Sequence, residues 1–149
     1  MIHQINEVKL SYQGSFLTSH QTVIKHSSDA AKLCFQSYDH NTITLQETFK
    51  ILLLNNANGV KGMYTHSIGG MTGTLVDLRI LFGVILKSLT PAIILCHNHP
   101  SGQLKASTAD KEITSKIVNA GAFLDVKVLD HIILSPTGSY FSFTDEGIL

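Results

Sequence analysis

A chain of 149 residues has the size of one ordinary domain and can bury a hydrophobic core. Its apolar content of 44% and charged content of 15% exclude a disordered protein. The formal net charge is zero and Arg79 is the single arginine, which argues against a strong nucleic-acid-binding protein but leaves a local basic patch open. No signal-peptide core opens the chain and no apolar run is long enough to cross a bilayer, so we expect a cytoplasmic protein without a membrane partner.

The start of the chain is weakly patterned. Residues 1–24 are interpreted as an N-terminal extension, with a short strand over 7–12, packed on a single domain formed by residues 25–149. The polar cluster at 27–29 is typical of a helix N-cap, and helical spacing of apolar residues continues to about Tyr38.

A β-hairpin is expected next. The apolar run 47–54 predicts a buried strand, and the turn cluster at 55–59 makes residues 60–66 its partner. Glu47 stands at the entry of that buried strand, an unusual place for a carboxylate. From the local pattern alone, a solvated side chain just outside the core is the simpler interpretation.

The second half alternates between helices and strands. Residues 75–89 carry apolar side chains on nearly all sides, which predicts a buried helix against the sheet. A helix is expected from Thr108 with Gly121 as its C-cap, then one or two strands in 124–135 and a last strand over 140–143. This order indicates an α+β (α/β-like) fold with a mixed sheet flanked by helices.

The most informative stretch follows the apolar run 91–95, which predicts a buried strand. Because side chains alternate along a strand, His97 and His99 share one face while Cys96 and Asn98 share the other. Two imidazoles on one face at a strand end can bind one divalent metal ion. Cys96 points away and is not expected to be a ligand.

A third ligand is available shortly after the turn. Ser107 is a natural N-cap for the following helix, and Asp110 then occupies its first turn. A helix that starts just beyond the strand end can bring Asp110 back to His97 and His99. Two histidines and one carboxylate leave a zinc ion one open position, as in hydrolytic rather than structural sites.

A simpler interpretation stays open for the same residues. Ser107 and Asp110 have the spacing of a capping box, which needs only helix-end chemistry. Two histidines near a strand end can also be merely hydrogen-bonded. The local pattern does not choose between these interpretations.

The combined spacing resembles a known signature. The pattern His97-x-His99-Pro100, six residues, Ser107, two residues, Asp110 is similar to the JAMM motif of the JAB/MPN metalloprotease superfamily. Within it, the chain resembles the RadC-like branch from about Ile24 to the C-terminus. The flanking segments that carry this likeness are 46–49, 97–102, 129–133 and 140–143. The resemblance implies a mostly antiparallel sheet of the JAMM/cytidine-deaminase type.

The resemblance also implies roles. His97, His99 and Asp110 would hold one Zn²⁺ per chain, although iron or manganese would suit the same ligands. Glu47 would be the general base and Ser107 would stabilise the oxyanion, in addition to or instead of capping the helix.

Asp130 and His131 belong to the family motif only. A structural role is the favoured interpretation for both, and support of the metal ligands is the alternative.

Three functions follow from these observations. The first is a zinc-dependent metallohydrolase that cleaves a peptide or isopeptide bond in a substrate the sequence does not name. The second is a DNA-repair or DNA-processing accessory of RadC type, which is weakened by the neutral charge and by a length too short for the family's N-terminal helix-hairpin-helix module. The third is a non-catalytic binding module, the weakest because the metal residues are all present.

Overall fold

The computed structural model describes residues 21–69 and 75–149. Within these ranges one sheet has five strands in the order β2-β1-β3-β4-β5. Only the β3–β4 pair is parallel, and the other neighbouring pairs are antiparallel. The predicted α+β fold with a mixed, mostly antiparallel sheet is therefore confirmed. In chain order, the elements are α1 (Ser27–Ser37), β1 (Thr48–Leu54), β2 (Val60–Ile68), α2 (Leu78–Lys87), β3 (Ala92–Asn98), α3 (Thr108–Phe123), β4 (Lys127–Leu134) and β5 (Tyr140–Ser142).

The N-terminal end of the described chain joins the hairpin. Val23 forms an isolated antiparallel bridge with Gly59, and Ile24 is buried in the core. The predicted strand over residues 7–12 lies outside the described residues.

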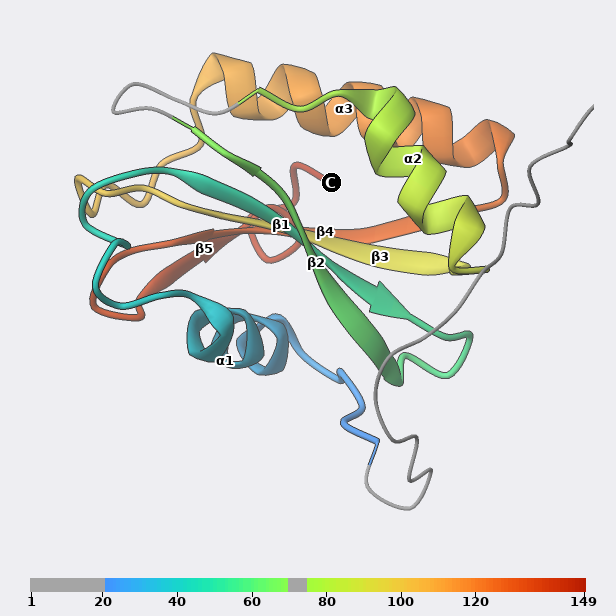
Figure 1. Ribbon diagram of the computed structural model, residues 1–149, viewed down its shortest axis with the longest axis horizontal. Helices are drawn as coiled ribbons and strands as arrows, with labels where there is room; N and C mark the ends of the chain where they lie inside the picture. Colours follow the sequence, from blue (N-terminus) through green and yellow to red (C-terminus); the bar gives the residue numbers. More distant parts are fainter. Residues whose placement is uncertain (1–20, 70–74) are drawn as a thin grey trace, which may run out of the picture.

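The sheet separates two layers of helix. Helix α1 covers one face, and α2 and α3 cover the other (Figure 1). Strand β3 lies in the middle and is buried along its whole length. Its Ile94 and Cys96 pack in the core under α1, whereas Ile93 and Leu95 pack in the core under α2. Burial on both faces explains why this strand is a continuous apolar run rather than an alternating one.

Helix α2 differs from its prediction in length and in burial. It starts after Asp77, whose side chain accepts a hydrogen bond from the Arg79 N–H, and it buries only one stripe of residues. Ile80 and Leu86 are 53% and 45% exposed. A helix on the outside of a sheet has one covered face, so apolar residues all around it do not make it buried. Neither α2 nor any other helix of the described ranges combines the length and apolarity needed to cross a membrane.

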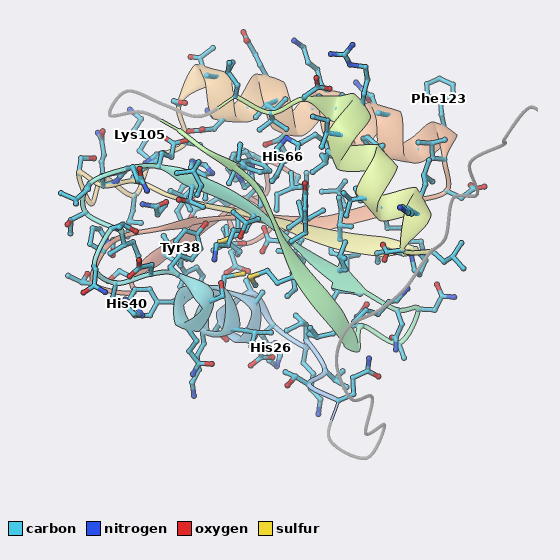
Figure 2. The ribbon with its side chains drawn as sticks, viewed as in Figure 1. His26, Tyr38, His40, His66, Lys105 and Phe123 are labelled. Atoms are coloured by element: carbon cyan, nitrogen blue, oxygen red, sulfur yellow. The ribbon has the colours of Figure 1, made fainter. Side chains whose placement is uncertain are left out.

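Helix α3 continues past its predicted C-cap. Gly121 is buried within the last turn, and the helix ends at Phe123, which points away from the molecule (Figure 2). A Cβ atom on Gly121 would lie 2.6 Å from the Val126 carbonyl oxygen. The left-handed backbone conformation instead occurs at Asp125, with φ of 53°. Gly121 is therefore required for close approach of the returning chain, and not for a left-handed cap.

Candidate metal centre

Two histidines converge at the carboxyl end of β3. His97 is the penultimate residue of the strand and is buried, and His99 follows one residue after the strand ends. Their Nε2 atoms are 3.0 Å apart. Cys96 packs on the other side of the sheet with Cys34 and Tyr38. The predicted orientation of these side chains is thus observed.

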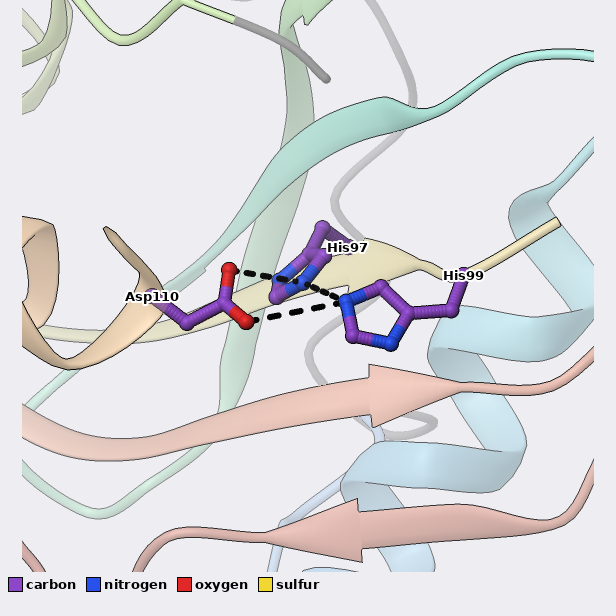
Figure 3. Close-up of side chains that lie close together, drawn as sticks. All are labelled: His97, His99 and Asp110. Carbon is purple, nitrogen blue, oxygen red and sulfur yellow. Dashed lines mark hydrogen bonds and ion pairs between the residues drawn. The ribbon is translucent and has the colours of Figure 1, made fainter. Parts of the chain in front are cut away.

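The first turn of α3 brings a carboxylate to the same point. Asp110 Oδ1 lies 3.3 Å from His97 Nε2, and Asp110 Oδ2 lies 3.6 Å from His99 Nε2 (Figure 3). One potential ligand atom from each of the three residues lies within 4.8 Å of the other two. We refer to His97, His99 and Asp110 as the triad.

The donor set of the triad suits a divalent metal ion. The Gln103 carbonyl oxygen lies 2.7 Å from His99 Nδ1 and can only accept a hydrogen bond, so Nδ1 carries the hydrogen. His99 Nε2 is then the atom that faces His97 and Asp110. Two ring nitrogens this close cannot both present bare lone pairs without a cation between them or near them. The triad can therefore hold either a proton or a metal ion, and two nitrogens with one oxygen leave zinc an open position.

The charges within the triad reinforce one another. Burial raises the pKa of the Asp110 carboxyl, but the adjacent imidazoles of His97 and His99 outweigh it and hold that pKa well below its usual range. The Asp110 carboxylate in turn raises the pKa of His99. A carboxylate that stays ionised next to two imidazoles favours any cation at this position.

Ser107 forms the predicted capping box with Asp110. Its Oγ accepts the Asp110 N–H at 3.1 Å, while the Asp110 Oδ2 accepts the Ser107 N–H at 2.7 Å. The Ser107 hydroxyl also donates to Asp110 Oδ2, at 2.7 Å. The capping interpretation and the metal interpretation are thus compatible, because the cap also orients the carboxylate of the triad.

Glu47 lies close enough to the triad to interact with its charges. It is half-buried and directly precedes β1, in which Phe49 pairs with His97. Burial raises the pKa of the Glu47 carboxyl, and the charges of His97 and His99 oppose that rise. The structure therefore brings Glu47 into electrostatic contact with the triad while the residue remains partly exposed to solvent.

The sequence did not identify Asn98 as a site residue, but in the structure its side chain connects two segments. Its side chain is fully buried on the face opposite the histidines. The amide oxygen accepts the Thr48 N–H at 2.8 Å, and the amide nitrogen donates to the carbonyls of Ile43 and Gln46 at 2.8 and 3.0 Å. Asn98 therefore fixes the segment that contains Glu47. The sequence signal for this role is a polar residue at the end of a largely apolar strand.

The side chains of Asp130 and His131 have different partners. Asp130 accepts hydrogen bonds from the Ser142 hydroxyl at 2.7 Å and from the Thr144 N–H at 3.1 Å, so it anchors the C-terminal segment. His131 is fully buried, and its Nε2 lies 2.8 Å from Nδ1 of His97. Burial holds the pKa of His131 well below its usual value. Asp130 thus has the structural environment that the sequence favoured, whereas His131 contacts the triad.

The comparisons with known proteins agree with this arrangement. Residues 24–148 match the family model described as the RadC-like JAB domain. The chain therefore belongs to the RadC-like branch of the JAB/MPN family. It is 53% identical over 102 residues to a UPF0758 protein of Flavobacterium johnsoniae and 39% identical over 104 residues to one of Porphyromonas gingivalis.

These matches cover only part of each chain. They cover 68% and 70% of this chain but 44% and 46% of the two relatives. The chain thus matches less than half the length of these relatives. The names of these relatives state no activity.

Proposed function

We propose that this protein is a metal-dependent hydrolase that cleaves an amide bond, of either a peptide or an isopeptide. The observation that carries the proposal is the convergence of the triad with a half-buried carboxylate, Glu47, beside it. His97, His99 and Asp110 would hold one zinc ion per chain. The ligand set also suits iron or manganese, so the metal is to be identified by measurement.

The metal and the protein would divide the chemistry between them. When bound, a zinc ion lowers the pKa of a coordinated water to about 7 and polarises a carbonyl group. Glu47 is not one of the triad, so its carboxylate stays available to take a proton from the attacking water and to pass it to the leaving amine. Its raised pKa suits this role, because a stronger base accepts the proton more readily.

Ser107 has a second task in this proposal. A hydroxyl donor directed at a developing oxyanion contributes about 3 kcal/mol in comparable sites. The Ser107 hydroxyl hydrogen is directed at Asp110 Oδ2 in the structure. It would have to rotate away from that oxygen before it could donate to the oxyanion.

The metal is the first thing to test. Elemental analysis of the purified chain should find about one zinc per chain, and His97→Ala should lose it because the triad loses a ligand. A wild-type protein that takes up no metal from a zinc-containing buffer would contradict the proposal.

The role of Glu47 is tested separately. Glu47→Gln should keep the metal and lose turnover of a mixture of peptides and lysine-linked isopeptides followed by mass spectrometry. Glu112→Gln removes an exposed carboxylate from α3 and serves as the matched control, with full activity expected. Cleavage by Glu47→Gln at the wild-type rate would contradict the assigned role.

A further inference from the structure

A chain of hydrogen bonds runs from one member of the triad to another through the interior. His97 Nδ1 contacts His131 Nε2 at 2.8 Å, and His131 Nδ1 contacts Thr114 Oγ1 at 2.6 Å. Thr114 lies in α3 one turn after Asp110, and its Oγ1 is 2.5 Å from the Asp110 carbonyl oxygen. His131 and Thr114 are both buried, so these contacts are shielded from bulk solvent.

The directions of these three hydrogen bonds follow from the final acceptor, the Asp110 carbonyl oxygen. A carbonyl oxygen only accepts, so the Thr114 hydroxyl donates to Asp110 O and its oxygen accepts from His131 Nδ1–H. With its N–H on Nδ1, the neutral tautomer of His131 presents Nε2 as an acceptor, and the hydrogen of the 2.8 Å contact then comes from His97 Nδ1. The lone pair of His97 is then on Nε2, the atom that faces Asp110.

We propose that His131 and Thr114 are positioning residues that present His97 to a metal ion through its Nε2 atom. The inference rests on the proposed metal site and assigns residues beyond the triad to it. Without the Thr114 hydroxyl, His131 can carry its proton on either nitrogen. A proton on His131 Nε2 would be donated to His97 Nδ1, and the proton of His97 would then occupy the ligand atom. Partners of this kind typically change metal affinity by about 10–100-fold.

His99 offers an internal comparison. Its Nδ1 donates to the backbone carbonyl of Gln103, which has the same fixed direction. A side-chain substitution cannot remove the backbone carbonyl that orients His99. It can remove the His131 and Thr114 side chains that orient His97. The orientation of His97 is therefore the one open to a direct experiment.

The test compares two substitutions at one position. Thr114→Val removes the hydroxyl with little change of shape, and Thr114→Ser keeps it. The dissociation constant for Zn²⁺ is measured by competition with a chromophoric chelator at one neutral pH. We expect Thr114→Ser to stay within about twofold of wild type and Thr114→Val to bind about tenfold more weakly. His131→Phe, which removes both ring nitrogens, should bind about 10–100-fold more weakly.

A second readout needs no metal. Long-range ¹H–¹⁵N spectra of the metal-free protein show which nitrogen of His131 carries the proton. We expect Nδ1 in wild type and in Thr114→Ser, and a mixture of both tautomers in Thr114→Val. Thermal melts of each metal-free variant separate a change in stability from a change in affinity.

The outcomes distinguish a failure of this inference from a failure of the proposed metal site on which it rests. Equal zinc affinities for Thr114→Val and Thr114→Ser, or a wild-type His131 protonated on Nε2, would overturn the inference and leave the metal site intact. A wild-type protein that binds no zinc would overturn both. If His131→Phe does not fold, the two Thr114 variants still decide the question.

Discussion

At His99 a proton and a metal ion would compete for the same atom. Its Nδ1 is occupied by the Gln103 carbonyl, and its Nε2 faces Asp110. The Asp110 carboxylate raises the pKa of His99 above the ordinary value of about 6.5. The folded metal-free protein thus gains stability from protonated His99, fully present below about pH 6.5 and lost as the pH rises through the raised pKa.

Metal affinity should follow the opposite course. Because the proton must leave before a metal binds, the affinity for zinc should increase as the pH rises through the raised pKa of His99. Chelator competition and melts of metal-free protein between about pH 6 and about pH 8 check both signs. His40→Gln, at an exposed histidine, should change neither profile, whereas His99→Gln should flatten the stability profile. Parallel pH trends of affinity and metal-free stability would contradict this account.

The Asn98 side chain connects β3 to the segment before β1. Asn98→Ala leaves the Thr48 N–H and the Ile43 and Gln46 carbonyls without their side-chain partner. Since each buried group left unpaired costs about 1–3 kcal/mol, we expect the free energy of unfolding to fall by about 3 kcal/mol. Urea denaturation measures it, and Asn56→Ala, in the exposed turn, should change it by less than about 0.5 kcal/mol. A loss no larger than that of the control would contradict the bridging role.

At the scale of elements, close packing rather than helix propensity decides what a glycine does. Gly121 in α3 and Gly83 in α2 are both helical, but a Cβ on Gly121 would meet the Val126 carbonyl oxygen whereas one on Gly83 would have no neighbour within 4 Å. Gly83→Ala should therefore raise the free energy of unfolding by about 0.5–1 kcal/mol. Gly121→Ala should lower it by about 1–3 kcal/mol, because backbone atoms must move. Denaturant melts of the two variants should shift in opposite directions, and equal shifts would show that propensity alone governs both sites.

The sequence predicted elements better than their surroundings. The hairpin, the buried strand before the histidines and the helix from Thr108 follow from apolar periodicity and turn residues, which are local signals. The exposed side of α2 and the place where α3 ends depend on what packs against each helix. Neither can be read from a segment alone.

The same division holds for the site. The spacing of His97, His99 and Asp110 is short, and one strand end followed by one helix start brings them together. The contacts of Asn98 and His131 join residues distant in sequence, through the pairing of β1 and β4 with β3. Such contacts become visible only when the order of strands in the sheet is known.

At the scale of the whole molecule, the balanced charge bears on whether the protein binds nucleic acid. A formal net charge of zero gives no general attraction to the phosphate backbone. We expect fluorescence anisotropy to detect no tight binding of this chain to duplex or single-stranded DNA at about 200 mM salt. Titrations at lower salt are the control for weak electrostatic contacts. Tight binding that weakens steeply with added salt would instead favour a DNA-processing role.

The one parallel pair of the sheet has a consequence for how the site assembles. The triad lies within a continuous β3–α3–β4 unit, whereas Glu47 arrives with β1 from a distant part of the chain. Short-range contacts form early during folding because little chain entropy is lost in closing them. A nascent or partly unfolded chain would then capture its metal before β1, and Glu47 with it, has paired with β3. Cofactor uptake and catalytic competence would be acquired as separate events, in that order.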